Sequence, residues 1–164
     1  MEKYFRDIDE RFDCGGGIVV MAGHPQKAFI KDYVLQYDND FYVRLSARVD
    51  MEAFSQKLSD LSTTFIVFKD GEVAGLICSY FYQPETKKGF ITLVHTKHEF
   101  RGRHLSLPLL DTVKQYAKER GFERIGLFVS KQQTSAYNLY SRHGFVTITE
   151  EENGRCQMEC ELKF

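Results

Sequence analysis

The chain has 164 residues, of which 43% are hydrophobic and 27% are charged, and its formal net charge is −1. This length suits one domain with a sizeable core, and the composition is that of a globular protein. The near-neutral charge provides no overall attraction to nucleic acid or to an anionic membrane, so neither is an expected partner. No stretch is long and apolar enough to span a bilayer.

The first forty residues are predicted to be mainly helical. A short amphipathic helix is expected over residues 1–14, because four apolar residues recur there at helical spacing: Tyr4, Phe5, Ile8 and Phe12. The glycines of residues 15–17 would end it as a flexible joint. A strand over 18–22 and a helix over 25–37 follow. We expect residues 1–40 to belong to the same domain as residues 41–164.

From residue 41 onward the pattern predicts an α+β fold. Residues 41–50 are expected to be irregular, and Asp50 is expected to cap a helix that reaches Leu61. Strands are predicted over 64–68, 72–82, 90–96, 123–129, 145–150 and 155–162, and helices over 105–120 and 134–142. Asp-Gly at 70–71 and Asn-Gly at 153–154 are signals for tight turns between strands. This order indicates a mixed, mostly antiparallel sheet covered by helices.

The four cysteines suggest a reducing compartment. They show neither CxxC pairing nor a histidine partner at the spacing of a zinc site, and no metal is expected: Cys14, Cys78, Cys156 and Cys160. The last two would share one face of a strand as small apolar residues. Residues 1–7 lack the apolar run of a signal peptide. A cytoplasmic location is therefore expected.

The most informative segment joins the strand at 90–96 to the helix at 105–120. A strand that feeds a compact loop opening a helix aims backbone N–H groups and the positive end of a helix dipole at one spot. That arrangement predicts an anion site, most often one for phosphate. Arg101 and Arg103 can add charge at its rim. On spacing alone, an ordinary turn with surface arginines is the alternative.

A second segment, residues 136–145 (AYNLYSRHGF), is predicted to be a short helix ended by Gly144 and followed by a strand. Together the two segments resemble the GNAT superfamily of acyl-CoA-dependent N-acyltransferases. Residues 101–106 (RGRHLS) are similar to its pyrophosphate loop, Arg/Gln-x-x-Gly-x-Gly/Ala, and the later segment is similar to its Asn-x-x-Leu-Tyr-x-x-x-Gly-Phe signature. The resemblance implies the GNAT fold, with residues 41–164 as an N-acetyltransferase core and acetyl-CoA as cosubstrate.

The resemblance also implies a cofactor site. The diphosphate would lie on the backbone N–H groups of the pyrophosphate loop, which here comprises Arg101, Gly102, Arg103, His104, Leu105 and Ser106. His104 departs from the family, which usually has glycine there because glycine lets the backbone approach a phosphate closely. It would either add a donor when protonated or cover the first helical turn. The preceding strand would bind the pantetheine arm through the main chain of Val94, His95 and Thr96, unless it is an ordinary buried strand.

Two residues of the second segment match functional positions of the family. Tyr140 matches a tyrosine that acts as general acid towards the departing thiolate, a step that needs a proton or a strong hydrogen bond. The alternative is that Tyr140 only packs. Asn138 matches a polar position that contacts the cofactor, and its alternative is a solvated helix residue.

No general base can be assigned from the sequence. The positions where relatives place an acid or a histidine correspond to Phe90 and Thr92, and neither ionises near neutral pH. Strand alternation is expected to turn His95 to the opposite face, and His98 is expected at the loop surface. The remaining candidates are His24, Tyr80, Tyr82 and water.

A weaker resemblance concerns the acceptor. Residues 41–50 are similar to a Phe-x-Pro-Pro-Leu-Ser-x-Arg-Val-Asp/Asn segment of small bacterial GNATs, some associated with surface-polysaccharide synthesis, although Val43 and Arg44 replace both prolines. This implies an amino sugar or a nucleotide-linked amino sugar as acceptor. Arg44 and Arg48 would then meet phosphate or carboxylate, or they are simply solvated.

The expected function is therefore transfer of an acetyl group from acetyl-CoA to a primary amine of a small molecule, by direct attack on the thioester. The alternatives are a non-catalytic acyl-CoA-binding module of the same fold and a protein-lysine acetyltransferase. The acceptor amine and the acyl chain length stay open, and the assembly is expected to be a monomer or a homodimer.

Overall fold

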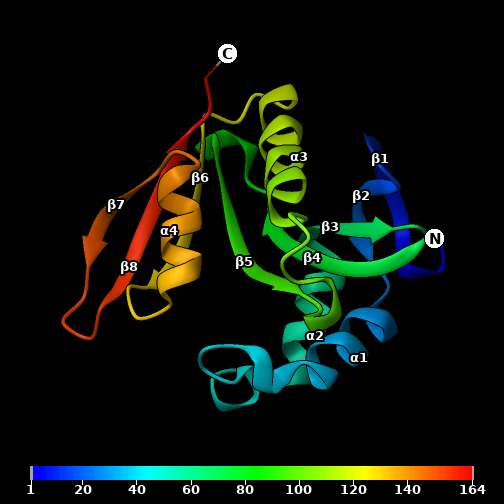
Figure 1. Cartoon of the computed structure of the whole chain (residues 1–164), viewed down its shortest axis with the longest axis horizontal. Helices are drawn as coiled ribbons and strands as arrows, with labels where there is room; N and C mark the ends of the chain where they lie inside the picture. The colour runs from blue at the N-terminus through cyan, green and yellow to red at the C-terminus, as the bar shows by residue number, and fades with distance from the viewer. Residues whose placement is uncertain (1, 164) are drawn as a thin grey trace.

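The computed structural model describes residues 2–163, and a single eight-stranded sheet organises them (Figure 1). Its strands are β1 (Phe5–Gly15), β2 (Ile18–Pro25), β3 (Ser62–Lys69), β4 (Glu72–Tyr80), β5 (Lys88–Thr96), β6 (Arg124–Ser130), β7 (Phe145–Glu150) and β8 (Arg155–Glu161). Their order across the sheet is β1-β2-β3-β4-β5-β6-β8-β7. Only β5 and β6 run parallel, so the predicted mixed, mostly antiparallel sheet is confirmed.

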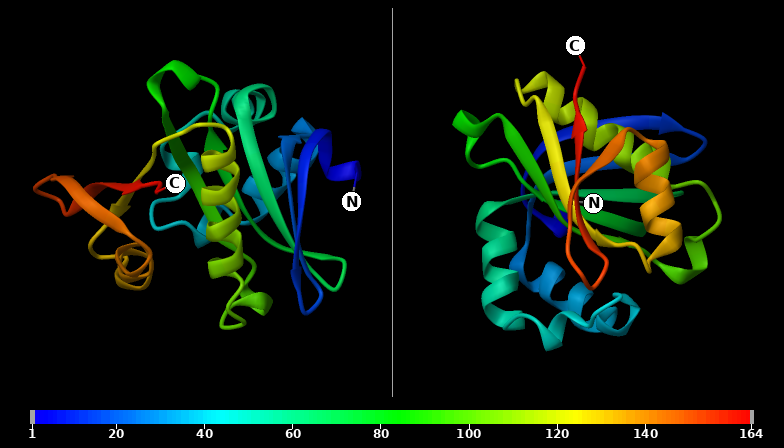
Figure 2. Two further views of the ribbon diagram at one scale, coloured as in Figure 1. Left: turned by 90° about the horizontal axis from the view of Figure 1, so that it is seen from above. Right: turned by 90° about the vertical axis from the view of Figure 1, so that its left-hand side faces the viewer.

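Four helices cover the two faces of the sheet. One face carries α1 (Lys27–Gln36) and α2 (Met51–Leu61), and the other carries α3 (Ser106–Glu119) and α4 (Thr134–Arg142), as the two further views show (Figure 2). Each pair of helices closes its own apolar core against the sheet. No helix within residues 2–163 is long and apolar enough to cross a membrane.

The predicted elements from residue 18 to the end of the chain are confirmed within a few residues at their ends. In the turn between β3 and β4, Asp70 and Gly71 both have positive φ, 51° and 84°, as the tightest hairpin turns require. Cys156 and Cys160 of β8 are buried in the core beneath α3 and α4, where they act as the small apolar residues that their spacing predicted.

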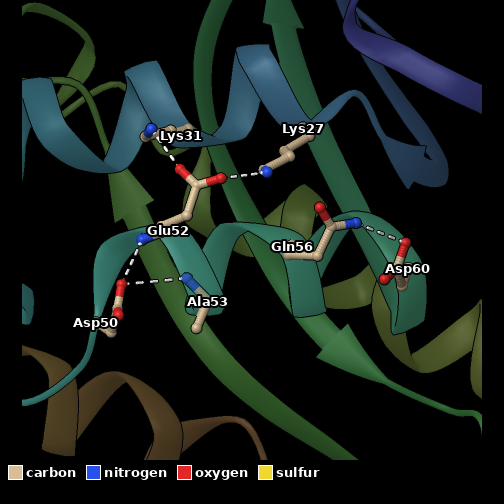
Figure 3. A network of polar contacts seen from close by, with 7 residues as sticks. All are labelled: Lys27, Lys31, Asp50, Glu52, Ala53, Gln56 and Asp60. Carbon is tan, nitrogen blue, oxygen red and sulfur yellow. Dashed lines mark hydrogen bonds and ion pairs between the residues drawn. The ribbon is translucent and has the colours of Figure 1, made fainter.

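Helix α2 begins at the predicted cap and is tied to α1 (Figure 3). Asp50 Oδ1 accepts hydrogen bonds from the backbone N–H groups of Glu52 at 2.9 Å and Ala53 at 3.3 Å. The carboxylate of Glu52 binds both Lys27 and Lys31 of α1. These two hydrogen bonds lower the pKa of Glu52 to about 2. The ion pairs link the two helices that flank residues 37–50.

The prediction of a short helix over residues 1–14 was wrong for the described residues 2–14, residue 1 lying outside the described range, whereas the helix predicted over 25–37 is present as α1. After a single 3-10 turn, residues 5–15 form strand β1, which pairs with β2, and residues 15–17 are the hairpin turn, with φ between 61° and 78°. Three register irregularities interrupt β1. They give its apolar residues a spacing that resembles a helix, but Phe5 and Phe12 lie in the cores on opposite faces of the sheet.

Candidate active site

Strands β5 and β6 separate part way along their length. Their parallel pairing comprises four residue pairs and ends at Ile91 opposite Leu127. Beyond that point β5 continues to Thr96 paired with β4, and β6 continues to Ser130 paired with β8. In Figure 1 the two strands lie together near the top of the view and diverge towards the bottom. Val94, His95 and Thr96, the predicted pantetheine-binding residues, lie on β5 beyond the last residue pair of this ladder.

The predicted pyrophosphate loop leads directly into α3. That helix has no side-chain cap, and within residues 2–163 no acceptor is found for the backbone N–H groups of Gly102 to Leu105. Gly102 and His104 both have positive φ, 76° and 58°. The left-handed conformation explains why glycine suits the position of His104, whose side chain is exposed. The loop presents unpaired donors at a helix N-terminus, as an anion site requires.

Arg101 is held in place at the start of this loop. Its Nε donates to the carbonyl oxygen of Thr96 at 3.0 Å, and its Nη2 donates to Asp40 Oδ2 at 3.4 Å. The guanidinium of Arg103 lies 5.4 Å from the ring centre of Phe100. Two cationic side chains thus flank the loop, as the sequence predicted.

A β-bulge decides which way the side chains of β5 point. Cys78 of β4 lies opposite Leu93 and Ser79 lies opposite Ile91, so Thr92 is an extra residue in the ladder. Ile91 therefore belongs to the core beneath α3, whereas Leu93 belongs to the core beneath α1.

The expectation that His95 faces away from Phe90 was wrong for this reason. Phe90 pairs with Tyr80, which packs on the α1 side, and His95 also lies on that side against Tyr33 and Tyr37. Strict alternation fails because the bulge inserts one residue between Phe90 and His95.

His95 is the centre of a buried polar cluster. Its side chain is 3% exposed, its Nδ1 lies 2.8 Å from the Tyr33 hydroxyl, and its Nε2 lies 2.8 Å from Asp40 Oδ2. Burial lowers the pKa of His95 and raises that of Tyr33, while the hydrogen bond from His95 lowers the pKa of Asp40.

These directions assign a neutral ring to His95. Its Nε2–H donates to the Asp40 carboxylate, and its Nδ1 accepts from the Tyr33 hydroxyl. Both nitrogens are engaged, so His95 holds its neighbours in position rather than offering a free basic nitrogen.

The α1–α2 connection (residues 37–50) contacts the ends of both diverging strands. Asp40 binds His95 at the end of β5, and the Tyr42 hydroxyl donates to Gln132 in the loop between β6 and α4. Within the connection, Asp38 accepts from the backbone N–H of Ser46 at 2.9 Å and from its hydroxyl at 2.6 Å. Nothing in the sequence pattern pointed to Asp40 or to Tyr42, because their partners lie more than fifty residues away.

The two arginines of this connection are solvent-exposed. Arg44 contacts Asp38 at 3.4 Å, and Arg48 forms no ion pair with another residue that the structure describes. Their side chains are available to a ligand, but their surroundings are those of solvated residues.

Tyr140 and Asn138 lie on α4 with different surroundings. Tyr140 is buried against Phe145, with 5.6 Å between ring centres, and burial raises its pKa to about 12. Its hydroxyl forms no hydrogen bond with any residue in the described range 2–163. The phenol is therefore protonated at neutral pH and free to donate. Asn138 is exposed.

The remaining base candidates lie apart from Tyr140 or are not basic. The Nδ1 of His24 on β2 is 2.7 Å from the carbonyl oxygen of Ser62, three strands away from β5. His98 is exposed, as predicted. Burial raises the pKa of Tyr80, and Tyr82 is exposed.

A cavity of about 520 Å³ lies beside α1 and does not include the loop residues 101–106 or Tyr140. Tyr33 and Tyr37 form part of its wall, together with Lys97 and Glu99 just before the loop. It is separate from the opening between β5 and β6.

Comparison with known proteins gives a consistent result. The model of the acetyltransferase (GNAT) family matches residues 28–145. N-acetyltransferase 8B of Homo sapiens is 30% identical over 109 residues, which are 63% of this chain and 48% of that protein. The chain thus spans about half the length of that curated relative.

Solved structures share the fold. The ribosomal-protein-S18-alanine N-acetyltransferase from Escherichia coli aligns with a TM-score of 0.68 and 13% identity, over 88% of this chain and 95% of that one. The PaiA N-acetyltransferase from Thermoplasma acidophilum, solved in complex with coenzyme A, aligns with a TM-score of 0.65 and 13% identity, over 87% and 98%. At such identities the likeness concerns the fold alone.

Proposed function

The chain belongs to the GNAT family of acetyltransferases, and on that premise we propose that it transfers the acetyl group of acetyl-CoA to a primary amine of a small molecule. The observation that carries the proposal is the coincidence of two features. The unpaired N–H groups of the uncapped loop lie at the end of the same strand, β5, whose edge is unpaired towards β6.

These features suit an acyl-CoA. The diphosphate would accept hydrogen bonds from the backbone of residues 102–106, with Arg101 adding a charge. The pantetheine arm would occupy the opening beside Val94, His95 and Thr96, using main-chain groups that lack a strand partner. Asn138, exposed on α4, would contact the cofactor from the other side.

The reaction follows from the two reacting groups. The neutral amine attacks the thioester carbonyl, the C–N bond forms, and the C–S bond breaks. Tyr140 protonates the departing thiolate, for which a phenol with a pKa of about 12 is a suitable donor. Water takes the proton of the amine, because Phe90 and Thr92 cannot. Positioning in the opening supplies the rest of the acceleration.

The acceptor, the cellular location and the oligomeric state are also proposals. The similarity of residues 41–50 to small bacterial relatives suggests an amino sugar. A non-catalytic acyl-CoA-binding module is the competing function, because His104 replaces glycine and no residue between 2 and 163 is assigned as general base. Cysteines that are all unpaired suit the cytoplasm. We propose a monomer or a homodimer.

Thermal unfolding with acetyl-CoA, free CoA, ATP and NAD tests the cofactor. A ligand at ~100 times its Kd should stabilise the fold by about 2.7 kcal/mol, which raises Tm by several degrees. A shift with only the two CoA species supports the proposal. If neither CoA species shifts Tm, the proposal is contradicted.

Tyr140→Phe separates the enzyme from the binding module. It should lower kcat by roughly 100-fold or more while leaving the Kd of CoA unchanged, because only proton donation is lost. Tyr137→Phe, on the same helix with its hydroxyl bonded to Thr147, is the matched control and should retain turnover. Equal activity of both variants would contradict the assigned role.

A further inference from the structure

Four aromatic side chains form a continuous surface on the α1–α2 face of the sheet. We call this surface the aromatic platform, and it consists of Tyr80, Tyr82, Phe90 and Phe128. The rings of Phe90 and Phe128 lie 5.6 Å apart at 62°, and those of Tyr80 and Tyr82 lie 5.7 Å apart at 85°. Tyr80 and Phe90 are direct cross-strand partners, which joins the two pairs.

The platform is located where β5 and β6 separate. The last residue pair of their ladder is Ile91 with Leu127, so Phe90 precedes that pair on β5 and Phe128 follows it on β6. Gly126 is the direct partner of Phe90 in the ladder and has no side chain of its own, and the Lys88 side chain lies over it. The two phenyl rings therefore border the inner end of the opening.

The platform also lies on the face from which an acceptor must come. The phosphate loop opens α3, which packs on the other face of the sheet. An acyl donor held by that loop reaches the opening from the α3 side. The amine must then approach the thioester from the opposite side, which is the side of Phe90 and Phe128.

The exposure of these rings is unusual for their position. Phe128 lies on β6, an inner strand of the sheet, and is still 42% exposed, while Tyr82 is 46% exposed. Among the residues that the structure describes, the core beneath α1 and α2 contains residues of β1 to β5 and none of β6. An exposed aromatic group on an inner strand beside a reaction site is typical of a surface that binds an apolar ligand.

The charges around the platform disfavour one class of acceptor. The Lys57 Nζ lies 5.0 Å from the ring centre of Tyr80, and the Arg155 guanidinium lies 3.9 Å from that of Phe128. Arg155 is itself paired with Glu151 at 3.6 Å, and Lys88 on the same face is paired with Glu159. The remaining positive charge disfavours a polyamine or a lysine-rich peptide modestly, by like-charge repulsion, and is compatible with a monoamine that reacts in its neutral form.

We propose that Phe90 and Phe128 determine acceptor specificity, and that the acceptor is a primary monoamine carrying an apolar ring, the arylalkylamine class. The inference rests on the proposed acetyl transfer, but it replaces the amino sugar that residues 41–50 suggest with a different acceptor class. The ring of the acceptor packs on the two phenyl groups, and its amino group extends into the opening towards the thioester. A hydroxylated amino sugar buries less apolar surface there and binds less well.

Steady-state kinetics with a panel of amines tests the proposal. With acetyl-CoA saturating, kcat/KM for 2-phenylethylamine should be higher than for ethylamine, glucosamine and spermidine. It should exceed the value for ethylamine by roughly 10-fold or more, which is the difference expected for burying a phenyl group. Phe128→Ala should remove most of that advantage, because it should lower kcat/KM for 2-phenylethylamine much more than for ethylamine. A higher kcat/KM for glucosamine or spermidine would overturn the proposal, and so would an equal loss for all amines.

Val146→Ala is the matched control. Val146 is an exposed apolar residue on the same face, two strands away on β7, and its loss should change no amine's kcat/KM. If instead Val146→Ala and Phe128→Ala both lower the sedimentation coefficient, a second copy of the chain covers this face and the proposal fails. Phe128→Leu serves as a second variant if the alanine variant unfolds.

Failure of the proposed function has a different signature. If the wild type binds acetyl-CoA but acetylates no amine, acetyl transfer itself is contradicted. Calorimetric titration of 2-phenylethylamine into the CoA complex then still tests whether the aromatic platform binds the amine. Binding that Phe128→Ala abolishes supports it, and no binding overturns it.

Discussion

At the scale of single residues, His104 has a backbone conformation that most side chains avoid. Its φ of 58° lies in the left-handed region, at the position where the family usually has glycine. His104→Val should lower the free energy of unfolding by about 1–2 kcal/mol, because a β-branched side chain tolerates this conformation poorly. His104→Gly should be near neutral, since relief of strain offsets the added chain entropy.

Urea denaturation of both variants measures this difference. His98→Val, on the exposed turn before the loop, is the control and should change stability little. Equal stability of the two position-104 variants would show that the backbone of the loop does not constrain this residue.

The buried His95 predicts how stability depends on pH. Its pKa lies below the usual 6.5, so the unfolded chain takes up a proton first as the pH falls. The stability that the neutral His95 contributes is fully present above pH 6.5 and is lost as the pH falls. The free energy of unfolding should then decrease by at most about 1.4 kcal/mol per pH unit. Burial lowers the pKa of His95 and the hydrogen bond to Asp40 raises it, and burial is the larger effect.

Denaturation of His95→Gln between pH 7 and pH 5 checks the assignment. Glutamine can still donate to Asp40 and accept from Tyr33 but does not titrate, so the slope should become shallower than in the wild type. His98→Gln should keep the wild-type slope. If His95→Gln leaves the slope unchanged, His95 is not buried in its neutral form.

At the scale of elements, α2 depends on its first turn more than on its last. Asp50→Ala should lower the free energy of unfolding by about 1 kcal/mol, because two backbone N–H groups lose their acceptor. Asp60→Ala is the internal control: its contact with Gln56 lies at the exposed end of the helix, where an acidic residue opposes the helix dipole (Figure 3). Comparable losses of Tm in both variants would contradict the capping role.

Caps and tight turns, which depend on neighbouring residues, were predictable from the sequence. Features that depend on how one strand pairs with another were not. The Asp50 cap and the Asp70-Gly71 turn follow from neighbouring residues. Strand β1 was missed because its irregular register imitates helical spacing. The bulge at Thr92 was missed because it exists only relative to β4. The contact between Asp40 and His95 spans 55 residues and carries no local signal.

At the scale of the whole molecule, the sheet consists of two parts joined by a short ladder. Strands β1–β5 form one part and β6, β8 and β7 form the other, and four residue pairs connect them. Acetyl-CoA that bonds the free edge of β5 should slow amide hydrogen exchange in residues 93–96 and 102–106. Exchange in β1 and β2, remote from the opening, should not change, which makes those strands the internal reference.

The short ladder between β5 and β6 also bears on the speed of turnover. Tyr42 and Asp40 connect the ends of the two parts through the α1–α2 connection. Under the proposed function, product CoA would break its main-chain bonds along the opening before it departs, whereas the acetylated amine would leave from the face beside Phe128. Release of CoA is therefore expected to be the slow step. Removing the hydrogen bond between Tyr42 and Gln132 should raise kcat even as it weakens CoA binding.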